Sequence, residues 1–387
     1  MTDTSSAEAR SAVAALEEQL RQLPKVSLHD HLDGSLRPAT IVELAAEVGH
    51  DLPASTPEEL EEWFVAASTS GSLETYLEGF AHTTAVMQSA ESLTRIAREY
   101  VEDLAADGVV YSEVRWAPEQ HQHGGLSLDD TVAAVQRGLE EGMDAVSEKD
   151  GFILVGQLVS AMRHSDRADE IVELALRHRD RGVVGFDIAG PEAGFPPSRF
   201  AGAFTELARG MMPATVHAGE GDGVESIRDA LISGRAQRLG HGVRIAEDIS
   251  VTANDGDSAE SPAEDVYEVE LGPVARWVRD RQIHLEISPT SNLQTGAVAG
   301  FAEGDDGAVL SDHPLDMLYQ LGFSVGINTD NRLVSGVTLS GELARVASTF
   351  AYELAELADF QINALEASFL GYEEREALSG MILEAWQ

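Results

Sequence analysis

The sequence contains no cysteine, and this absence excludes several kinds of site at once. Without thiols, the 387-residue chain has no disulfide bond, no thiolate nucleophile and no metal site built on cysteine. Lysine is nearly absent as well, since only Lys25 and Lys149 occur. Lys25 opens an expected strand and Lys149 lies in an expected turn, so neither is placed to form a Schiff base or to bridge two metal ions as a carbamate. A metal site in this chain is therefore expected to hold a single ion.

Positive charge and long apolar runs are also scarce. There are 26 lysine and arginine residues against 67 aspartate and glutamate residues, which gives a net charge of −41. A surface of this charge repels nucleic acid and anionic membranes, so we expect neither as a partner. No apolar run is long enough to span a membrane, and the polar residues 1–10 lack the apolar core of a signal peptide. The sequence therefore predicts a cytoplasmic protein with a short frayed tail at its N-terminus.

The tripeptide His29-Asp30-His31 ends a short apolar strand pattern near the start of the chain. The pattern begins after Pro24, and Asp33 follows it in a turn signal. Residues i and i+2 of a strand point to the same side, so His29 and His31 are expected to project together. Two imidazoles on one face are the beginning of a metal site, although the same spacing also occurs in ordinary packing.

Three later strand patterns also end in polar residues, which are His217 with Glu220, His241, and Asp330. Between the strand patterns, apolar residues recur at three- and four-residue spacing, which predicts helices. Strands that alternate with helices are expected to be parallel and joined by crossovers. In a TIM-type (β/α)8 barrel the catalytic groups come from the C-terminal ends of the strands. We therefore predict an α/β protein whose barrel brings these side chains together.

The chain length fits one enlarged barrel, and we expect residues 1–387 to form a single domain. Residues 38–106 separate the first strand pattern from the second, which is too much chain for one crossover helix. This spacing predicts a helical insertion after strand 1, placed to form a lid or a pocket wall. We interpret most of its aromatic residues as the packing of the insertion itself. The acidic stretch 252–270 predicts a surface loop or an insertion.

Three imidazoles and one carboxylate from these strand ends would supply the donors that zinc accepts in a catalytic site. The four candidate ligands are His29, His31, His217 and Asp330. A metal ion in such a site acidifies bound water. Glu220 could then act as a general acid or base, and His241 is a second candidate for handling a proton. Each residue alone has an ordinary interpretation, since Glu220 could cap a helix and Asp330 could belong to a turn. Together they favour a mononuclear metallohydrolase.

Six segments, in order along the chain, are similar to motifs of the adenosine deaminase family. They are SLHDHLDGS (27–35), DIAGPE (187–192), VHAGE (216–220), LGHG (239–242), SNLQTGA (291–297) and NTD (328–330). The resemblance covers nearly the whole chain and implies a (β/α)8 barrel of the amidohydrolase superfamily with one zinc ion per subunit. It implies a monomeric purine-salvage hydrolase whose small-molecule partner is a purine nucleoside. A zinc-activated hydroxide would attack purine C6, converting adenosine or 2′-deoxyadenosine to inosine or 2′-deoxyinosine and ammonia.

The resemblance also implies roles for single residues. The four candidate ligands match the zinc ligands of the family, and His31 also faces the substrate. Glu220 matches the acid that protonates purine N1, and His241 matches the residue beside the attacking hydroxide. Gly190 matches a backbone contact with purine N3, and Asp33 matches a contact with the ribose 5′-hydroxyl.

One position departs from the family pattern. The family usually has two adjacent aspartates where this chain has Asp330-Asn331. Purine N7 is a hydrogen-bond acceptor, so its partner must donate. An aspartate donates only when it is protonated, whereas the amide NH2 of Asn331 donates at any pH. We therefore predict that Asn331 contacts the substrate; the alternative is a turn residue that leaves N7 without a partner.

Other functions remain open on the sequence. A related deaminase of adenine, or of a 5′-substituted adenosine such as aminofutalosine, would share the metal and the acid and would differ at the ribose side of the pocket. An AMP deaminase fits less well, because no basic residues can be placed around a phosphate. A catalytically inactive relative would be expected to lose a ligand or Glu220, and this chain keeps them all. A two-metal hydrolase lacks its bridging lysine.

Overall fold

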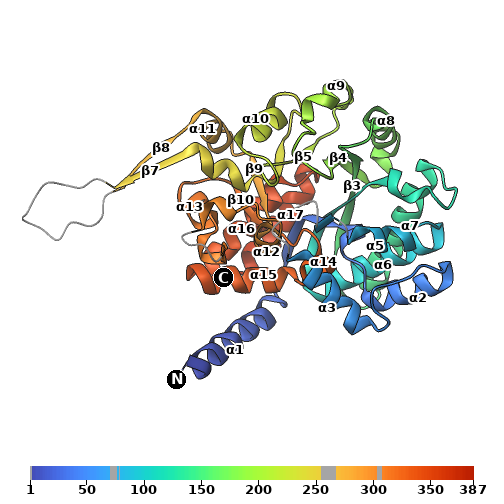
Figure 1. Cartoon of the computed structure of the whole chain (residues 1–387), viewed down its shortest axis with the longest axis horizontal. Helices are drawn as coiled ribbons and strands as arrows, with labels where there is room; N and C mark the ends of the chain where they lie inside the picture. The colour runs from blue at the N-terminus through green and yellow to red at the C-terminus, as the bar shows by residue number, and fades with distance from the viewer. Residues whose placement is uncertain (1, 70–75, 78, 254–266, 303–306) are drawn as a thin grey trace, which may run out of the picture.

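Eight parallel strands form the centre of the computed structural model, which describes residues 2–69, 76–77, 79–253, 267–302 and 307–387. Helices surround these strands, as Figure 1 shows. The strands alternate with helices along the chain, as their sequence pattern predicts. Their bounds are β1 Lys25–His31, β2 Val109–Trp116, β3 Leu154–Met162, β4 Val183–Ala189, β5 Thr215–Ala218, β6 Arg238–His241, β9 His284–Ile287 and β10 Val325–Ile327.

The eight strands are hydrogen-bonded in two halves, with the orders β1-β2-β3-β4 and β10-β9-β6-β5. Two parallel bridges join the halves, one between Phe186 and Ala214 and one between Asp30 and Asp330. The second junction is held by hydrogen bonds from His31 N to Asp330 O (2.7 Å) and from Asp330 N to His29 O (2.8 Å). The strands thus follow one another around a closed ring, which confirms the predicted α/β barrel. Every strand C-terminus faces the same end of this ring.

The long segment between β1 and β2 is helical over most of its described residues. A 3-10 turn (Leu32–Gly34) separates β1 from helix α2, and α6 is the crossover helix that leads into β2 and packs against α7. That this segment is an insertion within one domain stays a prediction. The helices of the chain are α1 Thr2–Leu20, α2 Pro38–Val48, α3 Pro57–Ser68, α5 Phe80–Val86, α6 Ala90–Ala106, α7 Leu128–Ser147, α8 Ala168–His178, α9 Ala201–Arg209, α10 Val224–Ile232, α11 Pro273–Asp280, α12 Pro289–Gln294, α13 Leu315–Gln320, α14 Arg332–Ser335, α15 Leu339–Phe350, α16 Leu354–Ala367 and α17 Tyr372–Ala385.

One of two expectations about surface segments was wrong. The N-terminal residues form helix α1, which packs against α15, where a frayed tail was expected. The ends of the acidic stretch 252–270 belong to an antiparallel hairpin of β7 (Ile249–Ala253) and β8 (Tyr267–Leu271), which extends away from the barrel in Figure 1. Apolar and polar residues alternate in both strands, and this two-residue period outweighs the acidic composition. Residues 254–266 lie outside the described part of the chain.

Among the residues that the structure describes, no helix combines the length and the apolar character that a membrane crossing requires.

Candidate metal centre and substrate pocket

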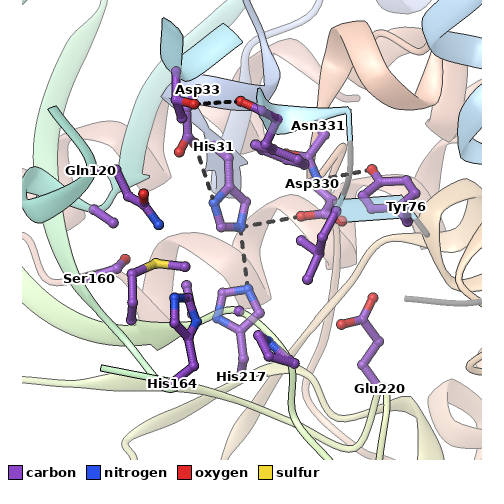
Figure 2. Close-up of a pocket in the computed structure, with 18 of the residues that line it drawn as sticks. His31, Asp33, Tyr76, Gln120, Ser160, His164, His217, Glu220, Asp330 and Asn331 are labelled. Carbon is purple, nitrogen blue, oxygen red and sulfur yellow. Dashed lines mark hydrogen bonds and ion pairs between the residues drawn. The ribbon is translucent and has the colours of Figure 1, made fainter. Parts of the chain in front are cut away.

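The four predicted metal ligands converge at the C-terminal ends of β1, β5 and β10. One atom from each of His29, His31, His217 and Asp330 lies within 4.8 Å of the corresponding atoms of the other three. The Oδ1 atom of Asp330 is 3.3 Å from His29 Nε2 and 3.4 Å from His31 Nε2. The Nε2 atoms of His31 and His217 are 3.3 Å apart, as Figure 2 shows. Three imidazoles and one carboxylate thus point at a common centre.

Local backbone geometry makes this convergence possible. Asp330 adopts a left-handed conformation with φ 61°, which few residues other than glycine tolerate. Its two backbone hydrogen bonds to β1 hold that conformation and carry the carboxylate over His29 and His31. Gly240 leaves room beneath them, since a Cβ at this position would lie 3.1 Å from both His29 Cε1 and His217 Cα. A side chain at this position would therefore crowd the ligands and force them to shift.

Two buried carboxylates orient the imidazoles of the cluster. Glu286 Oε2 lies 3.0 Å from His29 Nδ1, and Asp187 Oδ2 lies 2.8 Å from His217 Nδ1. Arg115 bridges these carboxylates, with Nη1 3.1 Å from Asp187 and Nη2 2.6 Å from Glu286. Burial alone would raise the pKa of Asp187, but His217 and Arg115 outweigh it and lower that pKa to about 2. Glu286 accepts from His29 Nδ1, and Asp187 lies within ion-pair distance of His217 Nδ1, an arrangement that leaves both Nε2 lone pairs facing the centre.

The donor atoms of the cluster fit a metal ion. His29 Nε2 is buried, and no described residue makes a hydrogen bond to it, although Asp330 Oδ1 lies 3.3 Å away. Burial and Arg115 would lower the pKa of His29, but Asp330 and Glu286 outweigh them and raise it. Burial lowers the pKa of His31 well below its usual value and lowers that of His217 too, so both rings are neutral and offer lone pairs. Imidazole nitrogens together with one carboxylate are the donor set that zinc and related divalent ions accept.

Glu220 lies beside the cluster, in a turn after β5 that hydrogen bonds to Glu192 hold in place. The carboxylate of Glu192 accepts hydrogen bonds from the backbone N–H groups of Gly219, Glu220 and Gly221, and from the hydroxyl of Ser226. The side chain of Glu220 is itself buried, at 6% exposure. Burial, and after it the charges of Asp330 and Glu192, raises the pKa of Glu220 well above its usual value. This environment favours the protonated form, which a general acid requires.

His241 lies beside Glu220 at the edge of the cluster and is held there by a buried hydrogen-bond chain. Asn292 Nδ2 lies 2.9 Å from His241 Nδ1, and His313 Nε2 lies 3.3 Å from Asn292 Oδ1. Burial lowers the pKa of His241 well below its usual value, so the ring is neutral. With Nδ1 accepting from Asn292, the proton is on Nε2, which lies 3.5 Å from Glu220 Oε2. His241 therefore presents a donor to the space between Glu220 and the metal ligands.

A cavity of about 540 Å³ opens over these groups and contains the predicted substrate contacts Asp33, Gly190 and Asn331. Burial raises the pKa of Asp33 to about 7. Gly190 has φ 94°, a conformation that glycine adopts without strain. Among the described residues that line the cavity there is no lysine or arginine. The cavity therefore suits a neutral ligand of nucleoside size.

The structure thus brings together all nine residues that the sequence singled out, while their roles stay predictions. Tyr76, Leu77 and Phe80 also line the cavity, so the segment after β1 forms part of the pocket wall, as its position in the chain predicts. Tyr76 and Phe80 pack against the hydrophobic core as well. Sequence reasoning missed the residues that hold the ligand cluster in place. The motifs that contain Asp187, Glu192 and Asn292 were a signal for them, but Arg115 and Glu286 lie inside strands and carried no signal.

Comparisons with known proteins give a consistent picture. Residues 24–385 match the family model described as adenosine deaminase. The chain is 51% identical over 362 residues to the adenosine deaminase of Mycobacterium sp. (strain JLS), covering 93% of this chain and 94% of that protein. It is 48% identical over 368 residues to adenosine deaminase 1 of Streptomyces coelicolor, covering 95% and 88%.

Solved structures with similar folds include two other purine deaminases. The adenine deaminase of Arthrobacter aurescens has a TM-score of 0.76 at 26% identity, covering 94% of this chain and 98% of that one. The N6-mAMP deaminase MAPDA of Arabidopsis has a TM-score of 0.77 at 26% identity, covering 95% and 100%.

Proposed function

The chain belongs to the adenosine deaminase family, and from this premise we propose that it hydrolyses adenosine and 2′-deoxyadenosine to inosine, 2′-deoxyinosine and ammonia. The observation that carries the proposal is the placement of Glu220 and His241 beside the convergent ligand cluster. An acid, a hydrogen-bond donor and a metal-binding set around one cavity are what hydrolytic deamination of a purine requires.

In this proposal, each residue of the cavity contacts a different atom of the purine nucleoside. Glu220 donates its proton to N1, which makes C6 electrophilic, and its raised pKa supports this role. The backbone N–H of Gly190 donates to N3, and the amide of Asn331 donates to N7. Asp33 contacts the ribose 5′-hydroxyl. These contacts orient C6 toward the metal centre.

In this proposal His29, His31, His217 and Asp330 would hold one zinc ion. When bound, the ion supplies a water molecule acidified for attack at neutral pH. His241 donates from Nε2 toward the oxygen that adds to C6, and so stabilises the negative charge that develops there. Glu286 and Asp187 keep His29 and His217 in the tautomers that ligation requires. We also propose that the protein is monomeric and lies in the cytoplasm.

The proposal is tested by following the ultraviolet absorbance of the adenine ring with purified, zinc-loaded protein. Adenosine and 2′-deoxyadenosine should be converted, and ammonia should be released in equal amount. Adenine and 5′-substituted adenosines such as aminofutalosine serve as competing substrates. Conversion of one of these, without conversion of adenosine, would keep the chemistry and overturn the assignment of substrate.

A 5′-phosphate should be rejected. The Arabidopsis protein ADAL has been solved in complexes with IMP and with GMP. In this chain, no described residue lining the cavity is a lysine or arginine, and Asp33 lies where the 5′-hydroxyl is expected. Placing like charges together costs several kcal/mol, so we expect kcat/KM for AMP to be at least ~100-fold below that for adenosine. Equal values in the same assay would contradict a nucleoside site.

A further inference from the structure

Tyr76 reaches the cavity from the segment between α3 and α5 and contacts Asn331 there, as Figure 2 shows. The amide Nδ2 of Asn331 donates to the hydroxyl oxygen of Tyr76 at 2.9 Å. The same hydroxyl lies 2.9 Å from Ser335 Oγ. All three side chains are buried. A residue of the helical segment after β1 is therefore hydrogen-bonded to the loop after β10, which also carries Asp330.

These contacts confine the amide of Asn331 from two sides. On one side Tyr76 accepts one of the two hydrogens on Nδ2, which leaves the second hydrogen unused. On the other side the amide oxygen packs against Gly34, where a Cβ would lie 1.8 Å from it. That oxygen is buried, and none of the described residues makes a hydrogen bond to it. When Tyr76 donates its own proton to Ser335 Oγ, its oxygen can only accept, and the amide then has one orientation that gives it a partner, with Nδ2 facing Tyr76.

We infer that Tyr76 is a positioning residue that directs the free N–H of Asn331 toward N7 of the purine ring. The inference rests on the proposed function and adds a determinant of ring specificity to it. Without the Tyr76 hydroxyl, the amide loses the partner that distinguishes its nitrogen from its oxygen. Its carbonyl oxygen can then face N7, and two acceptors in contact repel each other. Tyr76 thus favours rings with an acceptor at position 7.

The matched substitution is Tyr76→Phe, which keeps the ring and removes only the hydroxyl. Steady-state turnover of adenosine is measured with 7-deazaadenosine as a competitor, because this analogue lacks the N7 acceptor. We expect KM for adenosine to rise about fivefold, with little change in kcat, while the competition constant of 7-deazaadenosine stays within about twofold. If Tyr76 acted through packing alone, its substitution would weaken the binding of adenosine and of 7-deazaadenosine by the same factor.

Phe80→Leu provides the control, since Phe80 lines the same wall and its ring centroid lies 6.4 Å from that of Tyr76. This substitution should change the KM for adenosine and the competition constant of 7-deazaadenosine by the same factor. In an Asn331→Ala background, Tyr76→Phe should no longer alter the ratio of these two constants. If Tyr76→Phe does not fold, Ser335→Ala removes the neighbouring hydroxyl and should shift the ratio in the same direction.

The inference would be overturned if Tyr76→Phe left the ratio of the KM for adenosine to the competition constant of 7-deazaadenosine unchanged. It would also be overturned if Tyr76→Phe shifted this ratio as much in the Asn331→Ala background as in the wild type. Failure of the wild-type protein to convert adenosine would instead overturn the proposed function, so the two failures are distinguishable.

Discussion

Replacing Glu220 with glutamine should lower kcat for adenosine by about two orders of magnitude or more, with fold and metal content unchanged. Purine C6 is a poor electrophile until N1 is protonated, and glutamine has no proton to transfer. The substitution keeps the shape of the side chain, and the turn stays clamped because Glu192 binds backbone N–H groups there. Stopped or continuous ultraviolet assays measure kcat, and elemental analysis measures the metal.

Glu225→Gln is the matched control for this variant. Glu225 lies five residues further along the chain, on α10, and its side chain is 82% exposed. Removing its charge should leave kcat within about twofold of wild type, because substitutions of exposed side chains usually change the stability of a protein very little. If Glu220→Gln turned over adenosine at the wild-type rate, Glu220 would not be the acid.

The second large effect is expected for Asp330→Asn. This variant should lose metal on dialysis and should lower kcat/KM by roughly two to three orders of magnitude, since even partners of metal ligands are worth 10–100-fold. Asparagine tolerates the left-handed backbone that Asp330 adopts, so the two hydrogen bonds to β1 should survive. Far-ultraviolet circular dichroism checks the fold, and metal content after dialysis is the readout independent of activity.

Asp280→Asn, at an exposed position on α11, controls for the loss of one negative charge. It should retain metal and rate. Wild-type metal affinity in Asp330→Asn would remove Asp330 from the ligand set and leave the three imidazoles to bind the ion alone.

The barrel and the ligand cluster could be predicted because both depend on local patterns. A strand pattern that stops at His217 or at Asp330 can be read from neighbouring residues, and the closure of a parallel sheet then brings distant strand ends together. The spacing of His29 and His31 needed only the two-residue period of a strand. None of these inferences required knowledge of a contact between particular distant side chains.

The supporting residues could not be predicted in this way. Arg115 and Glu286 lie inside strands and are 171 residues apart in sequence. Their role depends on a hydrogen bond between them across the barrel. Tyr76 shows the same limitation, because an aromatic residue in a helical segment is indistinguishable from core packing until the fold places it beside Asn331. The left-handed backbone of His241 is likewise fixed by its surroundings.

The central claim is that a metal ion in this cluster drives adenosine deamination. The most direct measurement is the turnover of adenosine by one protein sample before chelation, after chelation and dialysis, and after titration with zinc, with bound metal measured at each step. We expect activity to disappear with the metal and to return in proportion to zinc, up to one ion per chain. Full activity in metal-free protein would contradict the claim.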